Sequence, residues 1–191
     1  MIYVPFGSGC FVAESLKLSG KRKQAFPFDW CIVDISQIGN IIEHIKTDID
    51  DFIKYMFSNI ERCKWCELEK YNNCEYGDAF HTIYNLTYPH HNLFEQKDTI
   101  IKRLYRFREC IGSDITYIIS DKFCYHSYSY NDIEYNNMYD DDIQKLEARY
   151  NIITASYEPG YDLQYVCNDN WRTVSEQLVK ELGNCDKFNN I

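Results

Sequence analysis

The sequence predicts a single domain over residues 1–191 that mixes helices and strands, of the α+β or α/β class. Short apolar runs typical of buried strands occur at 2–5 and 115–120, and apolar residues recur with a helical period over 35–45. A chain of 191 residues with uniform composition fits one domain that buries roughly 70% of its unfolded surface. Its hydrophobic fraction of 45% and charged fraction of 26% exclude the disordered, collagenous and coiled-coil classes.

The first half of the chain predicts one strand followed by three helices. Ser8 stands where an N-cap belongs and Gly20 where a helix would end, so a helix is expected between them. Pro27 interrupts the run AFPFDW, which we interpret as a buried loop or a short extended segment. A strand is expected over 2–5 and helices over 10–18, 34–45 and 47–57, the last capped by Thr47.

The second half predicts strands and helices in alternation. Residues 61–78 are charged and carry cysteines, which indicates a surface insertion. The segment 128–142 is polar, acidic and aromatic, and we expect a loop whose aspartates lead into the next helix. Strands are expected over 79–89, 115–120, 152–156 and 163–166, and helices over 94–111, 143–150 and 173–183.

The net charge and the cysteine content of the chain indicate which partners and which cellular compartment to expect. The formal net charge of -9 and the pI near 5.0 repel phosphate backbones, so nucleic acid is not an expected partner. No stretch has the roughly 18–20 apolar residues of a membrane span, and the N-terminus lacks a signal peptide, so we expect a cytoplasmic protein. Nine cysteines without an export signal favour free thiols, a metal site or a catalytic thiol over a disulfide framework.

Cys10 lies in the stretch GSGC, where an apolar strand gives way to a helix. A cysteine in the first turn of a helix feels free backbone N–H groups and the positive end of the dipole, which favour the thiolate. Glycines on both sides of Ser8 allow a tight turn, and the N–H groups of Gly9 and Cys10 could form an oxyanion hole. The alternative is that Cys10 is a small buried hydrophobic residue.

This stretch and a second motif resemble one known family, the papain-like cysteine peptidases of bacteria and large DNA viruses, which are little characterised. Its members share a G-S-x-C-x-x-A-x-x-L stretch followed by P-F-D-W. The later segments YPHHN, IIKRLYRFREC and ITYIIS agree more loosely. The resemblance implies a papain-like domain with the nucleophile on an N-terminal helix, a central sheet, and the general base on a later strand. The matching residues are Gly7, Ser8, Cys10, Ala13 and Leu16, then Pro27, Phe28, Asp29 and Trp30.

Cysteine catalysis of this kind needs an imidazole within hydrogen-bond reach of the sulfur. His90 and His91 match the family's histidine-rich segment, and neighbouring residues on a strand face opposite ways, so only one can be the base. We favour His91 over His90, with His81 in reserve. His44 lies on a predicted helix and His126 in an aromatic loop. A structural role remains the alternative for each of these histidines.

A third group would orient the imidazole, and two residues are candidates. Asn92 stands where the family has an acid, although adjacent side chains on a strand rarely bond to each other. Asp29 lies in the rigid, apolar PFDW segment, where it could instead cap a helix or accept hydrogen bonds within a turn.

Two other groupings have their own chemistry. Cys63, Cys66, Cys74 and His81 could bind zinc, although the spacing is irregular and surface thiols in an insertion are the favoured interpretation. Basic side chains on the helix predicted over 94–111 could clamp a carboxylate or phosphate, or form a solvated face; they are Lys102, Arg103, Arg106 and Arg108.

Two functions follow as expectations. The first is a thiol hydrolase without a cofactor, in which Cys10 attacks a peptide, isopeptide or related amide bond and passes through an acyl-enzyme. The second is an inactive papain-like scaffold that binds a protein partner, a host factor in the host cytoplasm if the source is viral.

Overall fold

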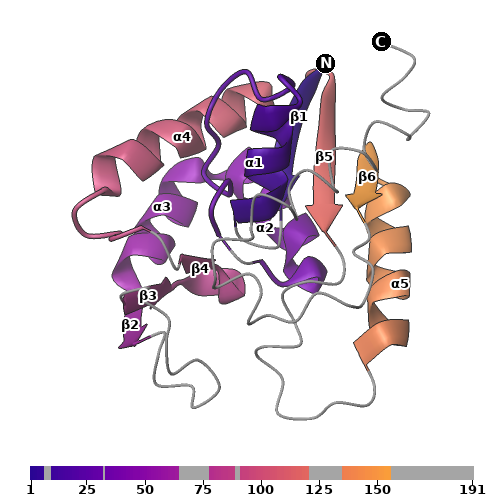
Figure 1. Cartoon of the computed structure of the whole chain (residues 1–191). Coiled ribbons are helices and arrows are strands. Elements are labelled where there is room, and N and C mark those ends of the chain that lie inside the picture. The colour runs from indigo at the N-terminus through magenta and orange to yellow at the C-terminus, as the bar shows by residue number, and fades with distance from the viewer. Residues whose placement is uncertain (7–9, 32, 65–77, 89–90, 121–134, 156–191) are drawn as a thin grey trace.

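The computed structural model shows a mixed helix and sheet protein, which confirms the predicted class (Figure 1). It describes residues 1–6, 10–31, 33–64, 78–88, 91–120 and 135–155. The strand predicted at 163–166 and the helix predicted at 173–183 lie outside these ranges. No helix within them is long and apolar enough to cross a membrane.

A parallel sheet joins segments that are far apart in the chain. Its strands are β1 (Ile2–Phe6), β5 (Ile115–Ser120) and β6 (Ile152–Ala155), in the order β1-β5-β6. Ile2 lies opposite Ile115 in one pair, and Tyr117 lies opposite Ile152 in the other. Because all three strands are parallel, their carboxyl ends share one edge of the sheet, the kind of edge at which open α/β sheets bind ligands.

Apolar residues at helical spacing pack the helices against this sheet. The helices are α1 (Cys10–Leu18), α2 (Ile35–Thr47), α3 (Ile49–Ser58), α4 (Lys97–Cys110) and α5 (Tyr135–Glu147). In α1 the side chains of Val12, Ala13 and Leu16 are buried, and the helix packs on β1 and β5. The buried residues of α2 are Ile35, Ile38, Gly39, Ile41, Ile42 and Ile45.

A second, antiparallel sheet lies away from the first (Figure 1). It consists of β2 (Glu61–Lys64), β3 (Asp78–His81) and β4 (Thr87–Tyr88), with the short 3-10 helix η2 (Ile83–Asn85) between the last two. The prediction of strands within 79–89 is thus confirmed. At the start of the proposed insertion, residues 61–64 form a paired strand, which the charged sequence did not indicate.

An aromatic cluster fixes the loop that contains the PFDW motif. Phe28 stacks on Phe6 of β1 with ring centroids 4.3 Å apart, and Phe107 of α4 meets both rings edge to face. Phe26 also meets Phe107 edge to face, with ring centroids 6.3 Å apart. The loop is therefore buried between β1 and α4, as predicted for residues 25–30.

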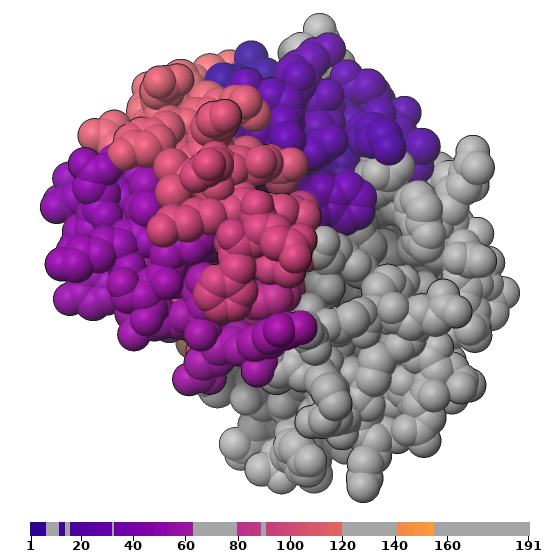
Figure 2. Space-filling view, turned by 90° about the vertical axis from the view of Figure 1, so that its left-hand side faces the viewer, coloured from indigo at the N-terminus to yellow at the C-terminus, as the bar shows by residue number. Residues whose placement is uncertain are grey.

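Helices α3 and α4 pack against each other, and their segments border one another on the face shown in Figure 2. The Tyr105 hydroxyl donates to Asp50 Oδ1 at 2.5 Å. The ammonium group of Lys97 lies 5.1 Å from the centre of the Phe57 ring. These contacts join the helix that follows the histidine-rich segment to the first half of the chain.

Several helix boundaries differ from the predictions, and two of these differences have a clear physical reason. Helix α5 begins at Tyr135, so the loop predicted over 128–142 is wrong from Tyr135 onward. The polar and acidic composition of residues 135–142 favours a loop in a prediction from sequence, but such a composition does not exclude a helix. The N-cap of α3 is Asp48 rather than Thr47, because the Asp48 carboxylate accepts from the N–H of Asp51 at 2.9 Å.

Candidate functional site

Cys10 is the first residue of α1, as the GSGC stretch predicts. Helix α1 follows β1, so Cys10 comes after the carboxyl end of an edge strand of the parallel sheet. The buried side chains of Val12 and Leu16 hold this helix against the sheet. The position combines the start of a helix with an edge of the sheet suited to ligands.

His91 lies between β4 and α4, not on a strand, which corrects the expectation drawn from the family resemblance. Its Nδ1 is 2.5 Å from Oε1 of Gln96, and its Nε2 is buried with no hydrogen-bond partner among the described residues. Because a carboxamide oxygen only accepts, Nδ1 carries the proton in this arrangement and Nε2 keeps its lone pair. His91 thus has a fixed ring and one nitrogen able to accept a proton.

The surroundings of His91 keep the ring uncharged near neutral pH. Burial lowers the pKa of His91, its hydrogen bond to Oε1 of Gln96 raises it, and the positive charge of Arg103 lowers it. The net shift is downward, so the neutral form needed by a general base predominates at pH 7.

The residue that orients His91 is Gln96, which the sequence did not single out. Asn92 has a different role: its Oδ1 accepts from the N–H groups of Phe94 at 3.1 Å and Glu95 at 3.3 Å. The Asn92 carbonyl then accepts from the N–H of Gln96 at 2.9 Å. This turn brings Gln96 back to the imidazole. Asparagine favours such turns, so Asn92 was the one feature of the sequence that could have indicated the turn.

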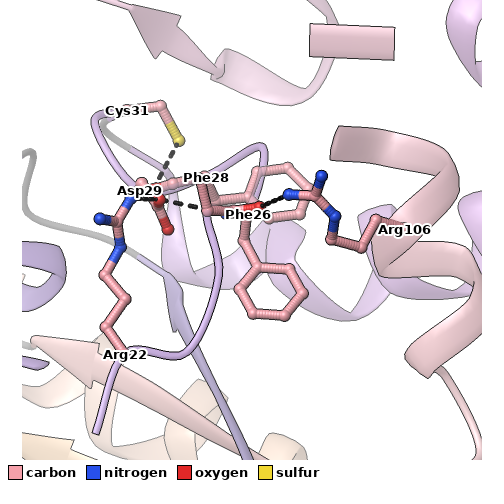
Figure 3. A network of polar contacts seen from close by, with 7 residues as sticks. Arg22, Phe26, Phe28, Asp29, Cys31 and Arg106 are labelled. Atoms are coloured by element: carbon pink, nitrogen blue, oxygen red, sulfur yellow. Dashed lines mark hydrogen bonds and ion pairs between the residues drawn. The ribbon is translucent and has the colours of Figure 1, made fainter. Parts of the chain in front are cut away.

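Asp29 is fully buried and binds within its own loop (Figure 3). Its Oδ2 forms an ion pair with Arg22 and accepts from the N–H of Phe26 at 3.1 Å. Burial raises the pKa of Asp29, while the hydrogen bond and charge of Arg22 lower it. The described contacts of Asp29 do not include His91, so they support the alternative of a turn acceptor.

Helix α4 braces the same loop. Nη1 of Arg106 donates to the Ala25 carbonyl at 2.7 Å (Figure 3). Arg103, one turn earlier in α4, is half-buried, whereas Lys102 is exposed. The basic residues of α4 therefore do not form one solvated face, because Arg103 and Arg106 turn toward the protein.

Unused hydrogen-bonding atoms gather around Arg103. Five buried atoms in this group have no hydrogen-bond partner among the described residues: Arg22 Nε, Asp29 Oδ1, Tyr88 OH, His91 Nε2 and Arg103 Nη1. The charge of Arg103 acts on Asp29, Arg22 and Tyr88, and also on His91. One unsatisfied buried group costs about 1–3 kcal/mol, so five together would rival the whole stability of a domain. These atoms are therefore expected to bind water or a ligand.

The other histidines in the described residues have structural partners. His44 contacts the Tyr84 hydroxyl at 3.0 Å and Asp51 Oδ2 at 3.1 Å. His81 Nδ1 is 2.8 Å from Thr87 Oγ1, and burial lowers the pKa of His81. Both fit the structural alternative for these positions.

The structure describes only two of the four residues considered as zinc ligands. Cys63 lies in β2 opposite Ala79, and His81 lies opposite Glu61 in the same strand pair. Cys66 and Cys74 lie outside the described residues, within which no group of three or more metal-ligating side chains occurs.

Ser8, Gly9, His90 and His126 also lie outside the described ranges. The chain matches no family model, no curated protein and no solved structure.

Proposed function

We propose that the chain is a cysteine-dependent hydrolase of the papain-like type, which cleaves a peptide, isopeptide or related amide bond. Cys10 is the nucleophile, His91 the general base and Gln96 the residue that orients the base. The observation that supports this most is the state of His91: Nδ1 is bound to Gln96 and Nε2 is left buried as an acceptor.

In the proposed reaction, Nε2 of His91 takes the proton of the Cys10 thiol. The thiolate attacks the carbonyl carbon of the substrate, and the N–H groups of Gly9 and Cys10 stabilise the oxyanion. The imidazolium then protonates the leaving amine, and a thioester joins the acyl group to Cys10. Water attacks this thioester with His91 again as base, which releases the acid and restores the thiol.

Gln96 contributes by holding the imidazole in one tautomer. When Nε2 gains a proton, the ring becomes positive, and the Oε1 dipole at Nδ1 stabilises that charge. A neutral carboxamide does so without adding a second charge to the buried site. The chemistry needs a reduced thiol, which agrees with the proposed cytoplasmic location.

The test is the pH dependence of iodoacetamide labelling at each cysteine, read by peptide mass spectrometry. Cys10 should label faster than the other eight thiols below pH 7, because His91 takes the proton of its thiol and the thiolate is the reactive form. His91→Ala should abolish that advantage, while His90→Ala, one residue away, should retain it.

The alternative is an inactive scaffold that binds a protein partner. If Cys10 labels like an ordinary thiol in the wild type and in both variants, the hydrolase proposal fails. If His90→Ala rather than His91→Ala removes the advantage, the base is His90 and the role proposed for Gln96 falls with His91.

A further inference from the structure

We propose that Arg22, Tyr88 and Arg103 form a binding site for a carboxylate group beside His91. The proposal rests on the proposed function in one respect. If the chain is an amide hydrolase, a carboxylate site beside the base means that its substrate carries a carboxylate close to the scissile bond. The binding of the carboxylate itself does not depend on Cys10.

The three side chains supply unused donors from fixed positions. Arg22 is held by its ion pair with Asp29, which leaves its Nε–H buried and without a partner among the described residues. Tyr88 is 0% exposed, and its hydroxyl has no partner there either. Arg103 adds the buried Nη1. A carboxylate has two oxygens that can accept several such bonds at once.

The fold brings these donors to one place. Arg106 attaches α4 to the loop through the Ala25 carbonyl, and Arg103 lies one turn closer to the start of that helix. The rings of Tyr88 and His91 have centroids 6.3 Å apart. The charge of Arg103 acts on Arg22 as well as on Tyr88 and His91, so both the loop and the histidine segment lie within electrostatic range of its guanidinium group.

The charges favour an anion with a single negative charge. Arg22 and Arg103 are positive, Asp29 is the acid whose charge acts on Arg103, and Arg106 adds a further positive charge at the Ala25 end. A carboxylate neutralises the net single positive charge of Arg22, Arg103 and Asp29, whereas a dianionic phosphate would leave these three groups and the ligand with a net negative charge in a buried site. The Arg22 side chain is 18% exposed, so the cluster reaches the solvent at its edge.

The first experiment is an acetate titration of the full chain, followed by the NMR signals of the arginine Nε–H groups. We expect saturable shifts at Arg22 and Arg103, weaker shifts with inorganic phosphate, and none with chloride at equal ionic strength. Arg103→Gln should abolish binding, while Lys102→Gln, which removes the same charge from an exposed neighbour in α4, should retain it.

Tyr88→Phe is the second variant, since it deletes one hydroxyl and keeps the ring. Loss of one hydrogen bond to a charged group should weaken acetate affinity roughly tenfold or more. Absence of saturable acetate binding in the wild type overturns the inference. Equal responses of Arg103→Gln and Lys102→Gln, in variants with native circular dichroism, overturn it as well.

The second experiment connects the carboxylate to the nucleophile. The rate of Cys10 labelling by iodoacetate, relative to iodoacetamide, should fall in Arg103→Gln and on adding acetate, but not in Lys102→Gln. If Cys10 shows His91-dependent reactivity and this ratio does not respond, the carboxylate inference fails while the proposed function stands. If Cys10 shows no enhanced reactivity, the proposed function fails, and the acetate titration alone decides the carboxylate site.

Discussion

The carboxamide of Gln96 influences the charge of His91 directly, because its hydrogen bond raises the pKa of that ring. Gln96→Glu should raise the pKa of His91 above the wild-type value, since a carboxylate stabilises the imidazolium more than an amide does. Gln96→Ala should lower it. The measurement is an NMR titration of the His91 ring, with the exposed Gln144→Glu in α5 as control. Unchanged titration in both Gln96 variants would contradict the contact.

Asp29 shows how much a single buried charge can matter. Asp29→Ala would leave Arg22 and the N–H of Phe26 without their acceptor, so it should cost about 3–5 kcal/mol of unfolding free energy. Asp34→Ala removes a half-buried N-cap that accepts from the N–H of Ser36 and should cost only about 1 kcal/mol. Urea unfolding of both variants measures the difference. Equal losses would mean that the loop is not held by the Asp29 ion pair.

At the scale of elements, the sequence predicts the parts that depend on local pattern. The bounds of α1 (Cys10–Leu18) and β5 (Ile115–Ser120) agree with the prediction because each has a clear period or apolar run and a clear end. Gln96 was missed because its contact with His91 depends on the turn formed by Asn92. On a regular strand or helix, residues five apart in the sequence do not face each other, so the spacing of His91 and Gln96 gave no reason to expect a contact.

The close approach of α2 and α5 occurs at Gly39, where a glycine lies inside a helix. An added Cβ would lie 3.4 Å from Leu146 Cδ2, which is ordinary contact, so Gly39→Ala should gain up to about 1 kcal/mol from helix propensity. Gly112→Ala should lose stability, because Gly112 has a φ of +96°. Thermal unfolding of the two variants should therefore show shifts of opposite sign. A loss in Gly39→Ala would show that the helices have no room for a methyl group.

At the scale of the whole molecule, α4 connects the two regions that carry the proposed chemistry. Its N-cap is Gln96, which binds His91, and its later turns hold the loop of Asp29 through Arg106. The aromatic contact of Phe107 with Phe6 extends this support to β1, the strand that precedes Cys10. A substitution that displaces α4 should therefore change the position of His91 and the proposed carboxylate site together.

Stability of the whole fold should decrease as the pH falls below neutral. Burial lowers the pKa of both His81 and His91 in the folded state, so the unfolded chain binds more protons once the pH falls below about 6.5. Their contribution is complete above that pH and is lost as the pH falls toward the folded values. Asp29 acts in the opposite sense, because its raised pKa makes stability fall as the pH rises above its ordinary value of 3.8.

Urea unfolding at pH 7.5, 6.5 and 5.5, values chosen to span roughly the ordinary histidine pKa, tests this balance. The wild type should lose stability across the series, and His91→Gln should lose less of it, because glutamine does not titrate. At pH 7.5 both histidines are neutral, so the difference there measures only the packing effect of the substitution. An equal decline in the wild type and His91→Gln would mean that His91 takes up its proton as readily in the folded state as in the unfolded chain. The buried, neutral base required by the proposed mechanism would then be absent.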